Sequence, residues 1–254
     1  MTATTLSPGR PAAAPAPRQP RLATTVLGWA CLGLLGATFG LGLMLPKSNE
    51  QAQYSRLIAI HPGLAWTSYV AVGTAAVAAI VALVRRSAAA DRVGAAAIEV
   101  GAVFTALTLV TGSIWGRPTW GVWWQWDPRL TSEALLMAVL LGSIGLRRSL
   151  EPGRGRATTS ALFALASAGL LPIVHFSVEW WRSLHQGRTL LSPDPGTNAD
   201  SGFIIAMLLG FVAFNLLFVW MVVHRTRLEA LEEEADAAAL GFAIDARRAE
   251  GVAR

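Results

Sequence analysis

The stretch SGFIIAMLLGFVAFNLLFVWMVVH, residues 201–224, contains no Asp, Glu, Lys or Arg. A helix that crosses a membrane needs roughly 20 consecutive, mostly apolar residues. Five similar runs precede it, at residues 22–46, 57–84, 93–116, 130–146 and 157–178. Backbone amides in lipid must be hydrogen-bonded internally, so each run should be a helix. The sequence therefore predicts an all-α polytopic membrane protein, with six transmembrane helices in residues 22–224.

The composition also favours a bilayer as the solvent. Hydrophobic residues make up 53% of the chain and charged residues only 15%, whereas soluble domains carry about 25% charged residues. The net charge is +5, but the basic residues stand between the apolar runs. We therefore interpret them as signals of membrane orientation rather than as a surface for nucleic acid.

Arginines predict which helix ends face the cytoplasm. They gather in the N-terminal segment and in the connections after the second and fourth runs, as Arg10, Arg18, Arg21, Arg85, Arg86, Arg92, Arg147, Arg148, Arg154 and Arg156. With six spans these segments lie on one side, and the positive-inside rule places both termini in the cytoplasm. Residues 1–21, rich in Pro and Ala, are predicted to be disordered. Residues 225–254 form a predicted cytoplasmic tail, for which a solvated helix is favoured over a partner-docking one.

Half of the ten tryptophans lie in one predicted outer loop, residues 115–131, which reads WGRPTWGVWWQWDPRLT. Tryptophan is common at membrane interfaces, and this explains one or two of them. It does not explain five so close together. If the segment is helical, the spacing i, i+3, i+4, i+7 collects four side chains on one face: Trp120, Trp123, Trp124 and Asp127. Such an aromatic surface fits a planar, apolar ring system.

Two charged residues of this loop have both structural and functional interpretations. Asp127 precedes Pro128, a pair typical of a helix N-cap and first position, so it can simply begin the fourth helix. Arg129 can anchor that helix at the interface or pair with a ligand carboxylate. The residues alone leave these alternatives open. Glu99, near the inner end of the third run, is expected to pair with a nearby arginine or to extend towards water.

Two histidines lie near the outer ends of predicted helices. His61 precedes Pro62, and a residue before proline is pushed out of the helical region, so the second helix should begin at Pro62. His175 follows Pro172 near the end of the fifth run, which leads outward. Both should reach the same depth on the same side, where neutral imidazoles are suitable axial ligands of a haem iron. His185, in the next outer loop, is favoured as a polar loop residue, with a spare ligand as the alternative.

Two strings resemble a known family. WGVWWQWDPRLT, residues 120–131, resembles the tryptophan-rich WWD signature of haem-handling proteins, and PIVHFSVEWWRSLHQ, residues 172–186, is similar to haem exporter protein C of the cytochrome c-maturation system. The resemblance covers residues 22–224. It implies six helices with an outer WWD loop, non-covalent haem b as the transported ligand, and delivery to a periplasmic haem chaperone. It also implies an ATP-binding cassette pair and a small single-span subunit as partners in the bacterial inner membrane.

The resemblance assigns roles to particular residues as well. It implies His61 and His175 as the axial ligands of the haem iron. It implies an aromatic platform made of Trp115, Trp120, Trp123, Trp124, Trp126 and Asp127. Arg129 or Arg117 is a candidate partner of a haem propionate. The motif His61-Pro62-Gly63 departs from the family, in which His-Val-Pro is common at the first histidine.

The resemblance predicts a protein that delivers haem and is not an enzyme. Three other classes of protein are alternatives. A cytochrome c haem lyase shares the tryptophan loop but usually has more spans and further histidines. A membrane b-type cytochrome usually holds its histidine ligands inside the bilayer. A structural assembly subunit would bind no ligand. The sequence has no Cys-x-x-Cys-His motif, so the chain is not expected to carry covalently attached haem. It has no phosphate-binding loop either, so it is not expected to hydrolyse ATP.

Overall fold

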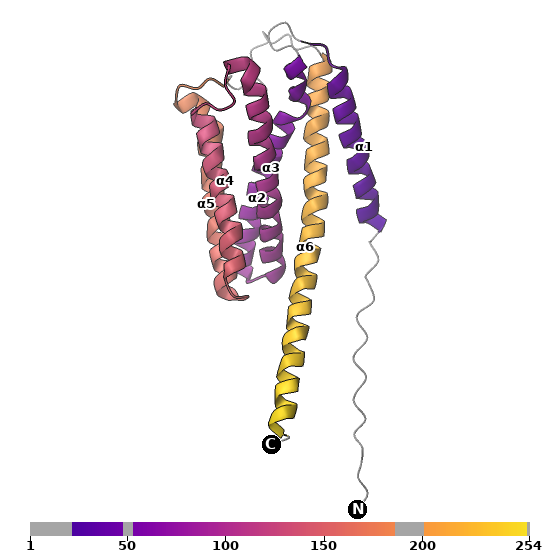
Figure 1. Ribbon diagram of the computed structural model, residues 1–254, viewed down its shortest axis with the longest axis vertical. Coiled ribbons are helices and arrows are strands. Elements are labelled where there is room, and N and C mark those ends of the chain that lie inside the picture. The colour runs from indigo at the N-terminus through magenta and orange to yellow at the C-terminus, as the bar shows by residue number, and fades with distance from the viewer. Residues whose placement is uncertain (1–21, 48–52, 186–200, 253–254) are drawn as a thin grey trace, which may run out of the picture.

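The six apolar runs form six long helices in the computed structural model, which describes residues 22–47, 53–185 and 201–252 (Figure 1). These helices are α1 Leu22–Met44, α2 His61–Arg85, α3 Ala88–Trp120, α4 Pro128–Ser149, α5 Arg154–Trp180 and α6 Ser201–Val252, and a short 3-10 helix, η1 Gln53–Ala59, leads into α2. Each of the six is long and apolar enough to cross a membrane, so the predicted all-α membrane fold is confirmed. The predicted disordered segment, residues 1–21, lies outside the described residues.

Successive helices run in opposite directions, so the bundle has two ends (Figure 1). The end where α2 begins at His61 and α3 ends at Trp120 is named the histidine end, and α4 begins and α5 ends there too. The opposite end is named the arginine end after the residues in and beside its connections: Arg85, Arg86, Arg92, Arg147, Arg148, Arg154 and Arg156. There α6 continues past residue 224, so the predicted tail helix is a direct continuation of α6 as far as Val252.

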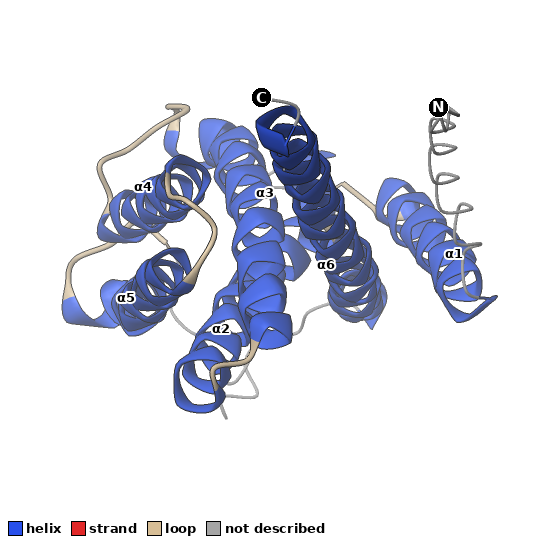
Figure 2. Cartoon of the chain, turned by 90° about the horizontal axis from the view of Figure 1, so that it is seen from below, coloured by secondary structure: helices blue, strands red, loops and turns tan. Residues whose placement is uncertain are grey.

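Small side chains allow close packing in the middle of the bundle. α2 and α3 contact each other along much of their length, and Ala71, Ala75, Ala96 and Ala97 are fully buried there. Lipid is as apolar as the side chains, so membrane helices associate through close van der Waals packing, which small residues permit. α4 and α5 lie on one side of this pair and α6 on another, while α1 is outermost, beside α6 (Figure 2).

The sequence left two conformations open for the tryptophan-rich segment, a loop or a helix. In the structure its first part is helical and its second part is not. α3 runs on to Trp120, so Trp115 and Trp120 lie on its last turns. It ends where Gly121 adopts a φ of 78°, a left-handed conformation that favours glycine. Residues 121–127 are not helical. The helical face that would join Trp123 and Trp124 to Trp120 is therefore not formed.

Candidate functional site

His61 is held against α3 by a hydrogen bond. It is the first residue of α2, one position earlier than predicted, and its Nδ1 lies 2.9 Å from the Thr111 hydroxyl oxygen. That hydroxyl donates its own proton to the Leu107 carbonyl at 2.7 Å. The Thr111 oxygen is therefore the acceptor, so the His61 ring carries its proton on Nδ1 and a lone pair on Nε2. This neutral form of imidazole is the one that binds a metal ion.

Two further residues of α3 shape the space around His61. The indole of Trp115, one turn beyond Thr111, meets the His61 ring edge-on, with ring centroids 5.7 Å apart. Gly112 lies directly against the same ring, because a Cβ added to it would stand 3.1 Å from Cε1 of His61. A larger residue at this position would push the ring away. Glycine thus allows the imidazole to lie on the surface of α3.

Asp127 connects the start of α4 to the segment that follows α5. It is the N-cap of α4, as one of its two interpretations predicted, and accepts a hydrogen bond from the Arg129 backbone N–H at 2.9 Å. The buried carboxylate also accepts 2.7 Å bonds from the Ser183 hydroxyl and the Leu184 backbone N–H. Burial alone would raise the pKa of Asp127, but these hydrogen bonds outweigh it and hold the pKa below its ordinary value.

His185 is placed by the same carboxylate. Its Nδ1 lies 3.1 Å from Oδ1 of Asp127, and its ring packs on Trp120 with centroids 4.7 Å apart. An ionised carboxylate can only accept, so Nδ1 carries the proton and Nε2 the lone pair. Burial lowers the pKa of His185, and Arg129 lowers it further, although the charge of Asp127 acts in the opposite direction. The imidazole is therefore neutral at neutral pH, as a metal ligand must be.

His175 faces a different part of the bundle. Its ring contacts Tyr69 of α2 and Phe176, with centroids 6.2 Å and 4.8 Å away. Tyr69 follows His61 on α2 by two helical turns, about 12 Å along the axis, so His175 lies nearer the middle of the bundle. By contrast, His61 is within electrostatic range of His185. There are therefore two candidates for the second axial ligand beside His61. The sequence favoured His175, and the geometry favours His185.

The predicted aromatic platform divides into two groups. Trp115 and Trp120 contact the histidines, as described above. Trp123 and Trp126 are exposed, and the ring of Trp126 meets that of Trp124 with centroids 5.6 Å apart. All three lie in the non-helical residues 121–127. The structure therefore brings two of the five predicted tryptophans directly to the imidazoles.

Sequence reasoning did not single out two polar residues close to this site. The Tyr69 hydroxyl on α2 faces the Arg129 side chain, and Glu133 on α4 is buried within the bundle. The available signal was an ionisable residue inside a predicted span, which in membrane proteins usually marks a paired or functional position. Hydropathy alone did not show that Glu133 and Arg129 stand close to the same tyrosine.

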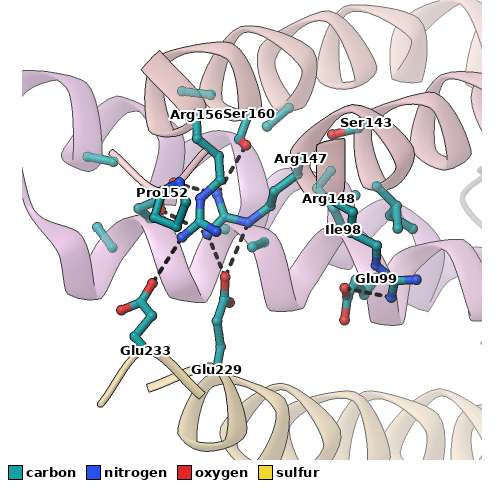
Figure 3. A pocket seen from close by; sticks show the side chains of 18 of the residues that line it. Ile98, Glu99, Ser143, Arg147, Arg148, Pro152, Arg156, Ser160, Glu229 and Glu233 are labelled. Atoms are coloured by element: carbon teal, nitrogen blue, oxygen red, sulfur yellow. Dashed lines mark hydrogen bonds and ion pairs between the residues drawn. The ribbon is translucent and has the colours of Figure 1, made fainter. Parts of the chain in front are cut away.

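A cavity of about 570 Å³ lies at the arginine end, between α2, α3, α4, α5 and α6 (Figure 3). Ion pairs join the helices around it. Arg147 of α4 binds Asp91 of α3 at 2.9 Å and also binds Glu229 of α6. Arg156 of α5 binds Glu233 of α6 at 3.2 Å. These pairs fix the continuation of α6 against the bundle.

Glu99 completes the charge network of the arginine end. It pairs with Arg225 of α6 and, at 3.3 Å, with Arg148 of α4, so the expected pairing with a nearby arginine is confirmed. Each of the four described arginines that line the cavity is thus paired with a carboxylate. The cavity lies at the opposite end of the bundle from His61 and His185 and is separate from the candidate site.

The sequence matches known proteins along most of its length. A family model described as "Heme exporter protein C" matches residues 12–240. The chain belongs to the haem exporter protein C family. Relatives include "Heme exporter protein C" of Haemophilus influenzae, 37% identical over 80% of this chain and 83% of that protein, and its namesake from Bradyrhizobium diazoefficiens, 37% identical over 83% and 81%. The Escherichia coli protein of the same name is 40% identical over 63% of this chain and 66% of its own length.

Membership of the haem exporter protein C family confirms the resemblance predicted from the two strings. It gives the chain a haem-handling role in cytochrome c maturation. The relatives are named as exporter proteins, which are components of transport rather than enzymes. Together with the six candidate spans, this makes the chain a multi-pass membrane protein of haem transport.

Proposed function

We propose that the chain holds haem b non-covalently at the histidine end and delivers it to a periplasmic haem chaperone, without acting as an enzyme. The observation that carries this proposal is the matched environment of His61 and His185. Each ring has its Nδ1 beside a protein acceptor, Thr111 or Asp127, and each packs against a tryptophan of α3. Both Nε2 atoms therefore carry lone pairs, which is the state of an axial haem ligand.

His61 supplies one axial ligand in this proposal. For the second, the geometry favours His185, whereas the resemblance favours His175. Two imidazoles fill both axial positions of the iron, which suppresses oxygen chemistry and leaves the haem free to be transferred intact. Because no covalent bond to this chain forms, release needs only the exchange of ligands.

Other residues of the histidine end complete the proposed site. The guanidinium of Arg129 lies within electrostatic range of His61 and faces Tyr69, so we assign it to a haem propionate. Trp123, Trp124 and Trp126, in residues 121–127, offer flat aromatic rings to the porphyrin.

The proposed location is the bacterial inner membrane, with the histidine end periplasmic and both termini cytoplasmic. The arginines in and beside the connections at the other end support this orientation. The proposed partners are the periplasmic haem chaperone, ATP-binding cassette subunits, a small single-span subunit and membrane lipid, and none is a nucleic acid.

Absorption spectra of purified variants test the ligand assignment. After expression with ample haem, we expect His61→Ala and His185→Ala each to lose the bis-histidine spectrum and most of the haem, while His175→Ala keeps both. If His175→Ala instead loses the spectrum and the haem while His185→Ala keeps both, His175 is the second ligand. His224→Ala at the arginine end, where the ring packs on Trp220, is the matched control. Wild-type haem content in His61→Ala would contradict a site at the histidine end.

A further inference from the structure

Glu133 lies in the second turn of α4, inside the bundle, and is only 6% exposed. Its Oε1 atom is buried and has no hydrogen-bond partner among the described residues. A carboxylate in the interior of a membrane bundle costs free energy unless it is paired, and such residues usually mark functional positions. Packing alone therefore does not explain a glutamate at this position.

The groups that face Glu133 come from α2 and from α4 itself. The hydroxyl of Ser68 and the phenol of Tyr69 approach it from α2. Arg129 stands one turn earlier on the same face of α4 and attracts Glu133 electrostatically. Oε1 of Glu133 accepts no hydrogen bond from the guanidinium, and Arg129 acts on the carboxylate through its charge alone.

This arrangement matters for any anion that binds Arg129. A haem propionate at the guanidinium would bring a second carboxylate into the same poorly solvated region. Two carboxylates near one cation repel each other, and the repulsion is stronger where water is scarce. The carboxylate of Glu133 should therefore oppose the binding of a propionate to Arg129.

We propose that Glu133 lowers the affinity of the haem site, so that haem is bound but readily released. Glu133 does not touch the iron and acts through Arg129, by competing with the haem propionate for the guanidinium. The inference rests on the proposed function, specifically on a propionate at Arg129. It predicts that removing this buried charge strengthens haem binding, whereas the loss of a merely structural residue would weaken it.

The rate at which the purified full-length chain loses haem to excess apomyoglobin measures this effect. The measurement is made in a buffer of about pH 8.5, which keeps ordinary carboxyl groups ionised. Glu133→Gln should then lose haem about tenfold more slowly than wild type, because the negative charge that repels the propionate is gone. Glu133→Asp keeps the charge and should resemble wild type. The matched control is Glu99→Gln, which removes a carboxylate at the arginine end and should leave the rate unchanged.

Arg129→Gln separates this inference from the proposed function. If a propionate binds Arg129, this variant loses haem faster than wild type, and adding Glu133→Gln to it has no further effect. Faster loss in Arg129→Gln without slower loss in Glu133→Gln would overturn the role of Glu133 and leave the haem site standing. Wild-type loss in Arg129→Gln would overturn the propionate contact and this inference together. Should Glu133→Gln not accumulate in membranes, Glu133→Ala removes the same charge and carries the same expectation.

Discussion

At the scale of residues, the histidine end is organised by the hydrogen bonds that fix two imidazole rings. His61 donates to the hydroxyl of Thr111, and His185 donates to the carboxylate of Asp127. A group bonded to Nδ1 sets the tautomer and the orientation of the ring, and so directs Nε2 towards a ligand. The carboxylate of Asp127 also stabilises positive charge on the His185 ring, which partly offsets the effect of burial on its pKa.

Thr111→Val tests whether the hydrogen bond to His61 orients that ring. The change removes the acceptor, and because groups of this kind typically contribute 10- to 100-fold to metal affinity, we expect haem affinity to fall about tenfold. Thr111→Ser should retain wild-type affinity. Titration of the apoprotein with haem, followed by absorbance, measures both. Thr74→Val is the matched control, because the Thr74 hydroxyl donates to the Val70 carbonyl in the middle of α2. Equal haem affinity in Thr111→Val and Thr74→Val would contradict the role of Thr111.

Local signals made part of the site predictable. A proline after His61, a cluster of tryptophans and the pair Asp127-Pro128 each mark a position without reference to the rest of the chain. The contacts of Asp127 with Ser183 and His185 were not predictable, because they join positions 56 and 58 residues apart. They depend on how α4 and α5 pack, which hydropathy does not report, so the sequence favoured a polar loop role for His185.

At the scale of elements, hydropathy located all six helices but not all of their ends. The apolar pattern of the third run stops at residue 116, where Arg117 and Pro118 follow, whereas α3 continues to Trp120. Its end is set by the left-handed Gly121, and the ring of Trp120 packs on His185. Helix ends that depend on such tertiary contacts lie outside what a window of apolar residues can predict.

Arg147 should be the most important single residue for the attachment of α6 at the arginine end. Its side chain is 11% exposed and binds Asp91 and, as Figure 3 shows, Glu229. Arg147→Met leaves these two carboxylates without their cation. Breaking a buried pair in this way typically costs several kcal/mol, so the free energy of unfolding in detergent should fall by about 3 kcal/mol. Arg148→Met, whose parent side chain is 70% exposed, is the control and should change stability little; equal stability of the two variants would contradict the buried cluster.

At the scale of the whole molecule, the bundle separates two kinds of polar chemistry. His61, His185 and most tryptophans lie at the histidine end, ion pairs such as Arg147–Asp91 lie at the arginine end, and small apolar residues pack between them. α6 has 52 residues, which at the rise of an α-helix gives about 78 Å, more than twice the thickness of a hydrocarbon core. It therefore extends past the bundle at the arginine end (Figure 1). The molecule is asymmetric in charge along its long axis, and such asymmetry orients a membrane protein.

Cysteine labelling tests this orientation, because the only cysteine of the chain, Cys31, is buried. Val122→Cys introduces an exposed thiol at the histidine end, and Glu151→Cys does so at the arginine end. In spheroplasts, a maleimide that cannot cross membranes should label position 122 at once and position 151 only after lysis, because the positive-inside rule predicts a cytoplasmic arginine end. The wild-type chain gives the background from Cys31. Labelling of position 151 before lysis, with position 122 protected, would show the reverse orientation. The histidine end would then be cytoplasmic, where a periplasmic chaperone could not take haem from it.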